Sequence, residues 1–450
     1  MAGGQRVTEQ LAQFLASSRW EDLPEPVRRE AVRGLLNFVG GALGGSIDEA
    51  MGLTIKVLTP FFGPAQATFI GHRARPDMLN AAYLNGMAAN VLEYDDTHLP
   101  TVMHAGAPAA PGILALAEQR RLTGAQLLHA FVLGLEAECR VGLSVMPNHY
   151  RRGKHITASC GIFGGAVASA KLLGLDAAGM ARALGHAATQ SAGLVESLGS
   201  MSKCLGVGGA GRNGLASALF AEAGFTAAEQ PIEGRFGFAA ANSETVDLAA
   251  ITDGLGERWT MLDNAYKPYP CGVVLFPVVD ACLTILARDK PPLDRIGAIQ
   301  VHGHPLLRER TDRPNIDSGR LGKVSLQHTV AAVFVRGRAG LAEYTDECVA
   351  DPAVRALRAK VRAADDETIP PEAAVVTVRL TDGSVLMEHV RHSRGTPGRP
   401  MTDAELDAKV TELAAAGAPF VDVPALIAAV RALPDAPDAA SFLKLTVPPA

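Results

Sequence analysis

Aromatic residues are scarce in this chain. Of its 450 residues, Phe, Trp and Tyr make up only 5%, whereas glycine occurs 46 times. An interior with few large rings is filled more readily by close helix packing than by an aromatic sandwich core. The contents of hydrophobic residues (48%) and charged residues (20%) are typical of a globular enzyme. The composition therefore favours a helical protein, and the length favours more than one domain.

Cysteine pairs and basic runs are missing as well. The six cysteines form no CxxC pair and no Cys/His cluster of zinc-finger spacing, so the sequence gives no support for structural disulfides or an iron–sulfur cluster. The net charge is −5, the isoelectric point is near 6.2, and no Lys/Arg run could follow a phosphate backbone. We therefore expect no nucleic-acid partner.

Long apolar runs are also absent. Residues 1–20 contain no continuous apolar stretch followed by a small-residue cleavage site, so they are not typical of a secretory signal. The most apolar later stretch, residues 158–175, is Gly-rich and contains Lys171, which favours a buried helix over a membrane span. We expect a cytoplasmic protein that does not associate with membranes.

The first 262 residues have a helical period. Start signals stand at Pro24, Thr123 and Asp176, and short Gly-marked turns separate the segments. We predict helices throughout residues 1–262.

Residues 263–397 differ in character, because prolines interrupt them and strand-like runs appear. We predict a strand over 296–301 and a hairpin over 375–390 with its turn at Asp382-Gly383. This part is therefore predicted to be an α+β insert.

Residues 398–450 return to a helical pattern, with Thr402 and Glu405 as a capping box. We predict that only the segment PDAPDAAS, near the C-terminus, is loose.

The densest polar cluster is NGMAANVLEYDDTHLPTVMH, residues 85–104. If the helix continues, Asn90, Glu93 and Thr97 share one face at i, i+3 and i+7. A solvated helix end is the ordinary interpretation. The run DDTH followed by His104 gives the functional interpretation equal weight, because two acids and two imidazoles so close together perturb one another's pKa values.

Two further segments carry isolated polar groups. His155 follows a basic loop and precedes a Gly/Ala-rich helix, so we expect a half-buried imidazole that titrates near neutrality. Lys203 is the only charged residue between Glu196 and Arg212. It either extends to the surface or points into a cavity, and the composition does not separate these alternatives.

The middle of the chain adds three candidates. Two prolines stiffen the loop YKPYPC, which presents Lys267 and Tyr269. His328 lies in the apolar segment SLQHTVAA, where a core histidine is the ordinary interpretation.

Taken together, these segments resemble the MmgE/PrpD family, whose activities include 2-methylcitrate dehydratase, cis-aconitate decarboxylase and iminodisuccinate epimerase. The resemblance spans nearly the whole chain. It depends on seven segments in order: LNGMAANVLEYDDTH, GKHITASCGIFGGAVASAKLLGL, MSKCLGVGGAGRNGLASALFAEAGF, IEGRFGF, KPYPCG, KVSLQHTVAAVFVRG and RGTPGRPMT.

The resemblance implies a large all-helical domain built from both chain ends (1–262 and 398–450), an inserted smaller α+β lid domain (263–397), an active site between them, and a homodimer. It implies a lyase that needs no metal or other cofactor and acts on a small polycarboxylic acid. A 2-methylcitrate dehydratase-like reaction is the first expectation, and epimerisation or decarboxylation of a related acid is the alternative.

The resemblance also implies site residues. Glu93, Thr97, His104, His155 and Lys203 match family site positions, and His328 stands where the decarboxylases carry a tyrosine. We expect His104 and His155 to be the acid and base in an unassigned order, and Lys203 and Lys267 to bind substrate carboxylates. Tyr269 and Asp95 are expected to contact the substrate.

Three departures bear on specificity. Glu93 replaces the more usual Asp, Gly206 stands where many relatives have His, and His328 argues against decarboxylation.

Two alternatives belong to other functional classes. In one, Asp95, Asp96 and His98 bind Mg²⁺ or Mn²⁺ in a helical enzyme with a diphosphate substrate. That class would need a second acidic ligand motif downstream, which the sequence lacks. In the other, the chain is a non-catalytic binding protein that has kept the scaffold.

Overall fold

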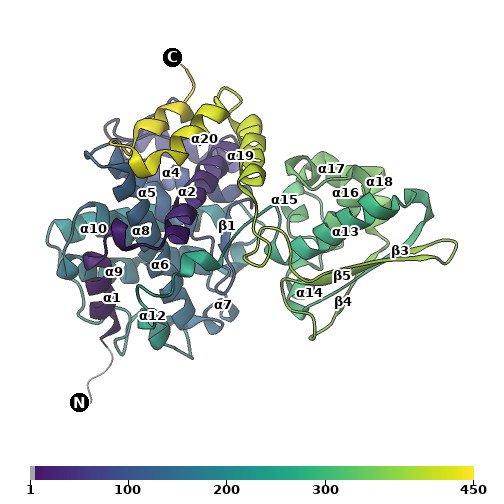
Figure 1. Cartoon of the computed structure of the whole chain (residues 1–450), viewed down its shortest axis with the longest axis horizontal. Helices are drawn as coiled ribbons and strands as arrows, with labels where there is room; N and C mark the ends of the chain where they lie inside the picture. Colours follow the sequence, from purple (N-terminus) through teal and green to yellow (C-terminus); the bar gives the residue numbers. More distant parts are fainter. Residues whose placement is uncertain (1–5, 450) are drawn as a thin grey trace. The chain divides into compact units, whose positions relative to one another are not determined.

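The computed structural model describes residues 6–449 and confirms the mainly α-helical fold with a small sheet (Figure 1). The chain divides into two units. The first contains the described residues up to Asn264 and those from Thr402 onward, and the second is Ala265–Met401. None of the helices among residues 6–449 has the length and apolar character that crossing a membrane requires.

The first unit is helical apart from the short strand β1 (Asp96–His98). Its helices are α1 (Val7–Ser17), α2 (Glu25–Gly45), α3 (Glu49–Leu58), α4 (Met78–Val91), α5 (Gly106–Ala117), α6 (Gly124–Val145), α7 (Asn148–Arg151), α8 (Ile156–Leu172), α9 (Ala177–Gln190), α10 (Ser202–Glu222), α11 (Phe238–Asn242), α12 (Ala249–Thr252), α19 (Asp403–Gly417) and α20 (Val423–Arg431). The C-terminal helix α19, yellow in Figure 1, packs against α2, so both chain ends build this unit.

Local capping explains where several helices begin. Thr123 forms a capping box with Gln126 before α6, and Thr402 forms one with Glu405 before α19. The Asp176 side chain accepts from the Gly179 amide at 2.7 Å before α9. These three predicted helix starts are confirmed, because each cap satisfies backbone amides that the helix itself leaves unpaired.

Small residues allow the central helices to approach closely. At the crossing of α8 and α10, a Cβ atom on Gly214 would lie 2.7 Å from the Ala166 backbone nitrogen. Lys171, the one charge in α8, extends its ammonium to the carbonyls of Leu15, Ala16 and Ser18 at the end of α1. The residues predicted as a buried helix are therefore confirmed as one, and the lysine is accommodated as a helix C-cap.

The segment 434–441 is not loose as predicted. The Ala439 amide donates to the Leu122 carbonyl at 2.9 Å, and the Gly124 amide donates to the Ala436 carbonyl at 2.9 Å. The Asp438 side chain accepts from the Ala440 amide at 3.0 Å. The segment is held by backbone pairing that its Pro- and Asp-rich composition does not reveal.

The second unit packs helices against a four-stranded sheet of order β4-β3-β5-β6. Strands β3 and β4 run parallel, and the other two pairings are antiparallel. The hairpin of β5 and β6, with its turn around Asp382-Gly383, and the strand predicted over 296–301 are both confirmed. The elements are β3 (Ile296–Gly303), β4 (Val361–Asp365), β5 (Ala374–Leu380), β6 (Val385–Val390), α13 (Phe276–Asp289), α14 (Pro305–Thr311), α15 (Gly319–Gly322), α16 (Leu326–Arg336), α17 (Asp346–Ala350) and α18 (Pro352–Arg358), while β2 (Asn264–Tyr266) lies where the two units join in sequence.

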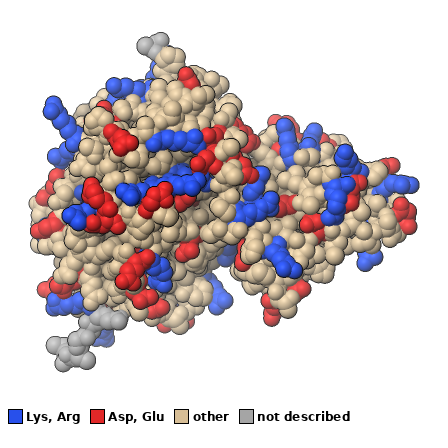
Figure 2. Space-filling view, viewed as in Figure 1, with Lys and Arg blue, Asp and Glu red and all other residues tan. Residues whose placement is uncertain are grey.

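Acidic and basic side chains are interspersed on the face shown in Figure 2, without a broad field of one sign. This agrees with the near balance of 42 Lys and Arg against 47 Asp and Glu. An anionic ligand would therefore depend on locally placed cations rather than on the field of the whole protein.

Candidate functional site

The predicted polar face at the end of α4 does not exist as a helix face. Helix α4 ends at Val91, and Glu93 follows with a φ of 56°, a left-handed conformation that an α-helix cannot contain. Thr97 lies beyond this turn in β1. The assumption of a continuing helix was wrong, and it is the turn and the following loop that bring these polar side chains to one place.

Asp96 anchors this loop from within the protein. Its two carboxylate oxygens lie 3.2 and 3.0 Å from the Gly106 amide at the start of α5, and its Oδ2 accepts from Asn264 Nδ2 at 2.7 Å. Burial and, to a smaller extent, the charge of Asp95 raise the pKa of Asp96 to about 6, although the Asn264 hydrogen bond partly offsets them. The Asp96 carboxyl group therefore connects β1 to the start of α5 and to Asn264, and its charge state changes near neutral pH.

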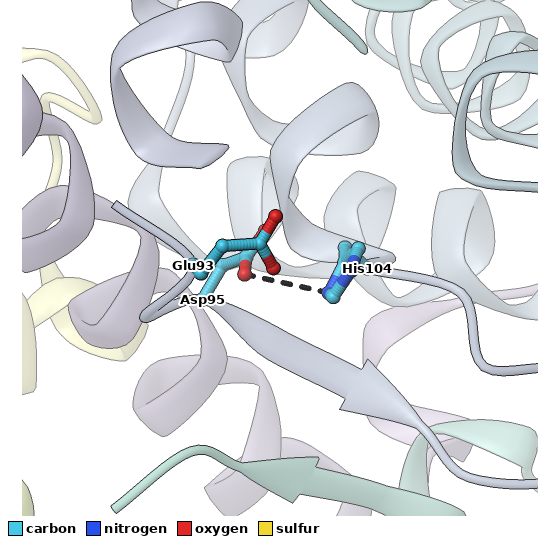
Figure 3. A group of neighbouring side chains, drawn as sticks. All are labelled: Glu93, Asp95 and His104. Carbon is cyan, nitrogen blue, oxygen red and sulfur yellow. Dashed lines mark ion pairs between the residues drawn. The ribbon is translucent and has the colours of Figure 1, made fainter. Parts of the chain in front are cut away.

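His104 closes the loop, with Nδ1 directed back toward β1. The nearest oxygens to Nδ1 are the Asp96 carbonyl at 2.8 Å, Thr97 Oγ1 at 3.2 Å and Asp95 Oδ1 at 3.3 Å. Figure 3 shows the Asp95–His104 pair with Glu93 beside it. A carbonyl only accepts hydrogen bonds, so the 2.8 Å contact assigns a proton to Nδ1. In the neutral ring, Nε2 then carries the lone pair.

His155 precedes α8 as its N-cap residue and is only 4% exposed. Burial, together with the nearby Lys203 and His104, lowers the pKa of its imidazole to about 3. The expected half-buried histidine that titrates near neutrality was wrong, because the Gly/Ala-rich helix packs so closely that water is excluded from the ring. His155 is neutral at physiological pH.

Lys203 points inward from the first turn of α10 and forms an ion pair with Glu93. The lysine is 5% exposed and the Glu93 side chain 19%. The structure thereby decides between the two alternatives for Lys203, because the ammonium does not extend to the surface. Lys203 and Glu93 both contribute to the electrostatic surroundings of His155.

Glu93, Asp95 and His104 could also hold a cation, because their ligand atoms lie within 4.8 Å of one another. This set differs from the metal ligands considered from the sequence. Asp96 instead bonds Gly106 and Asn264, and His98 Nδ1 contacts Thr101 Oγ1 at 2.7 Å. The Lys203 ammonium on Glu93 opposes a second cation there by charge repulsion.

Three predicted residues belong to the second unit, where each is buried. Lys267 is 1% exposed, and Tyr269 donates its hydroxyl to Asp280 at 2.5 Å. His328 is fully buried in α16, and its Nε2 lies 2.8 Å from the Glu343 carbonyl. Since that carbonyl can only accept, Nε2 donates, and burial lowers the pKa of the ring. The ordinary interpretation of His328 as a core histidine bonded to a carbonyl is confirmed.

Sequence reasoning named Asn90 only as part of a helix face and missed Thr157 and Glu138, which also support the site. Asn90 donates to Asp95, and Thr157 Oγ1 accepts from the His104 amide at 3.1 Å. Glu138, fully buried in α6, has a pKa raised well above its usual value by burial and by the charge of Asp96. Thr157 stands two residues after His155, so its position gave a signal. Glu138 gave none, because nothing in the sequence pattern separates it from a solvated glutamate.

The chain is similar to known proteins over most of its length. The chain matches the family models for the MmgE/PrpD N-terminal domain over residues 9–250 and the MmgE/PrpD C-terminal domain over residues 269–433. It is 26% identical to a cis-aconitate decarboxylase of Aspergillus terreus, over 91% of this chain and 89% of that protein. It is 25% identical to the Mus musculus enzyme of the same name and 24% identical to the Homo sapiens one, over 98% of this chain and 93% and 95% of those proteins.

Proposed function

The chain belongs to the MmgE/PrpD family, and from that premise we propose that it is a lyase of small polycarboxylic acids that works by proton transfer beside a carboxylate, without a cofactor. The observation that carries the proposal is the cluster of His104, His155 and Lys203 with two carboxylates in the helical unit. Making or quenching a carbanion-like centre next to a carboxylate requires a base, an acid and a cation, and this cluster contains all three.

In this proposal Lys203 binds a substrate carboxylate. Its ammonium has three donors, so it can contact a substrate oxygen while it keeps Glu93. In a site shielded from water, such a contact is stronger than it would be at the surface. Glu93 would in turn hold the ammonium in position and prevent an unpaired buried charge when no substrate is bound.

We assign the base to His155 and the acid to His104. His155 has a pKa near 3 and is neutral, so a ring nitrogen offers a lone pair at the working pH. His104 lies beside the Asp95 carboxylate, which favours the charged imidazolium over the neutral ring. A substrate carboxylate near His155 would raise its pKa toward the range in which it removes protons effectively. Acid–base catalysis of this kind contributes about 10²- to 10⁴-fold.

Dehydration in this site would begin with proton removal by His155. A neutral His155 ring nitrogen takes the proton from the carbon next to a carboxylate that Lys203 holds. The electron pair left on carbon forms the double bond as the carbon–oxygen bond of the neighbouring hydroxyl breaks. The His104 imidazolium gives its proton to the departing oxygen, which leaves as water, and Thr97, 3.2 Å from His104 Nδ1, helps to orient the ring.

Decarboxylation of cis-aconitate is the second candidate, because the relatives described above are named as cis-aconitate decarboxylases. The same cluster serves this reaction in another order. An acid protonates one carbon of the double bond, and the carbon–carbon bond to a carboxylate on the adjoining carbon breaks. Its electron pair forms a new, shifted double bond as CO₂ leaves. His328 argues against this candidate. The resemblance implies a tyrosine phenol at this position in the decarboxylases, whereas this chain has an imidazole that donates to the Glu343 carbonyl.

The test is a substrate panel on the purified protein. 2-Methylcitrate, citrate and cis-aconitate are each followed by proton NMR and by CO₂ release, before and after exhaustive chelation with EDTA. We expect turnover of at least one acid, unchanged by EDTA. Turnover that EDTA abolishes and one divalent ion restores would establish the metalloenzyme alternative, and no turnover of any member would favour the binding protein.

A further inference from the structure

A second concave site lies in the helical unit. A cavity of about 630 Å³ is lined by the segment after α5, by Thr68 and Arg75, and by residues 437–447 near the C-terminus. This volume is within the range of small-molecule sites. None of the residues proposed for catalysis lines the cavity, so it is not part of the candidate active site.

The acidic groups of the cavity are already engaged in the structure. Glu118 accepts from the amide and hydroxyl of Thr68 and forms an ion pair with Arg75 at 2.9 Å. Asp438 accepts from the Ala440 amide at 3.0 Å. Neither carboxylate needs a cation from outside, so the two acids do not make the cavity a metal site.

The cationic groups are in excess. Four basic side chains line the cavity with these two acids, and Glu222 adds a third carboxylate beside them through its ion pair with Arg120. Arg120 pairs with Glu222 at 3.2 Å. Among residues 6–449, neither Arg121 nor Lys444 has a hydrogen bond or ion pair with another side chain. Both side chains are exposed at the cavity, so each is available to contact an anion that enters it.

The rest of the wall is apolar. Leu122, Leu443 and Val447 contribute aliphatic surface beside the charges. The wall is also firmly held, because the Ala439 amide donates to the Leu122 carbonyl at 2.9 Å. A ligand that fits has a doubly charged anionic end and an apolar or ring-bearing body, and a free inorganic ion would leave the aliphatic surface uncovered.

We propose that this cavity binds a small phosphate monoester, with the phosphate dianion held by Arg121 and Lys444 and the body against Leu122, Leu443 and Val447. Guanidinium groups suit phosphate oxygens because they donate in a fixed fork, and a dianion can contact both unpaired cations. Helix α5 connects this site to the catalytic cluster, since it begins at Gly106, held by Asp96, and ends at Ala117 in the cavity wall.

The test measures binding of AMP to the full-length protein by isothermal titration calorimetry. The variant Arg121→Glu/Lys444→Glu reverses both unpaired charges, and Ala440→Phe fills the cavity without changing charge. The matched control, Lys56→Glu/Arg235→Glu, makes the same charge change at exposed residues outside the cavity. Thermal unfolding of every variant verifies that it is folded.

We expect one AMP per chain, a Kd at least about tenfold weaker in both cavity variants, and an unchanged Kd in the control. Tricarballylate, an unreactive tricarboxylate, should leave AMP binding unchanged, because it resembles substrates of the other site. Absence of saturable AMP binding, equal binding by the cavity variants, or displacement by tricarballylate would overturn the proposal. Because the readout is binding and not turnover, this result is independent of the proposed lyase activity.

Discussion

The Lys203–Glu93 ion pair links stability to activity at a single contact. Replacing Lys203 with Met leaves Glu93 without its cation. Because the Glu93 side chain is only 19% exposed, we expect the unfolding free energy to fall by roughly 1–3 kcal/mol. Removal of the proposed substrate clamp should also lower kcat/KM by about 10²- to 10³-fold. Thermal unfolding and steady-state kinetics measure the two effects.

A double variant separates them. Lys203→Met/Glu93→Gln removes both charges, so the thermal midpoint should return toward that of the wild type while kcat/KM stays low. Recovery of turnover in the double variant would mean that Lys203 serves only to neutralise Glu93.

Asp96 should give the protein a recognisable pH dependence of stability. Its pKa of about 6 in the folded state is above the value near 3.8 in the unfolded chain, so its stabilising contribution is complete below about pH 4 and is lost as the pH rises through 6. Asp96→Asn cannot ionise. The difference in unfolding free energy, Asp96→Asn minus wild type, should therefore rise by up to about 3 kcal/mol between pH 4 and pH 8.

Denaturant titrations at several pH values check this, with Glu257→Gln as the control at an exposed carboxylate. A difference between Asp96→Asn and wild type that is the same at pH 4 and pH 8 would show that Asp96 is not the titrating group.

His328 tests whether a buried histidine of the second unit affects the reaction. His328→Phe leaves the Glu343 carbonyl without its donor and should cost roughly 1–3 kcal/mol of stability. His328→Gln keeps a nitrogen donor near the position of Nε2, so it should stay close to wild type in thermal midpoint. If His328 helps to determine the reaction, kcat of the Gln variant should still fall by at least about tenfold, whereas an unchanged kcat would make the residue purely structural.

For single residues, the sequence predicted which ones belong to the cluster better than it predicted their protonation and backbone conformation. It singled out Glu93, Thr97 and Lys203, and the first unit brings their side chains to the same cluster as His104 and His155. It could not give the pKa of His155, because desolvation depends on how closely α8 and α10 pack. Nor could it reveal the left-handed turn at Glu93, a conformation that residue type alone does not favour.

Helix contacts in the first unit depend on glycine at the crossing of α8 and α10. Gly214→Ala would place a Cβ atom 2.7–2.8 Å from backbone atoms of Gly165 and Ala166, which cannot move aside as a flexible side chain could. We expect a loss of about 1–3 kcal/mol. Gly52→Ala in α3 is the matched control, because nothing lies within 4 Å of the new methyl group, and it should stabilise by roughly 0.5–1 kcal/mol.

Chemical denaturation of the two variants gives both values. If Gly214→Ala is as stable as Gly52→Ala, the crossing is more adaptable than the backbone distances imply.

Elements were predicted well where a local signal exists. Capping residues located the starts of α6, α9 and α19, and the Asp-Gly turn located the β5–β6 hairpin, because both are set by neighbouring residues. The end of α4 was missed because Asn90, Glu93 and Thr97 keep the i, i+3, i+7 spacing of a helix face past Val91. The parallel pairing of β3 with β4 could not be read either, since it joins strands nearly sixty residues apart through tertiary contacts alone.

For the molecule as a whole, the change in composition near residues 263 and 397 reflects a real difference in architecture between the helical part and the α+β part. The role of residues 263–397 as a lid domain, the site between domains and the homodimer came only from the resemblance and stay predictions. The proposed chemistry, in contrast, is tied to a cluster within the first unit, so it can be tested without assumptions about assembly.

The most direct test of the lyase proposal is proton NMR of the purified protein with 2-methylcitrate, citrate or cis-aconitate in D₂O. We predict turnover of at least one acid. When that reaction has reached equilibrium, deuterium should appear on a carbon next to a carboxylate, delivered by reverse hydration or by the protonation that accompanies decarboxylation, and its rate of appearance should fall by at least about 10²-fold in His155→Gln. An equilibrated reaction that leaves no deuterium on carbon in either the hydroxy acid or a decarboxylated product, or an undiminished rate in a folded His155→Gln variant, would contradict proton transfer by this cluster.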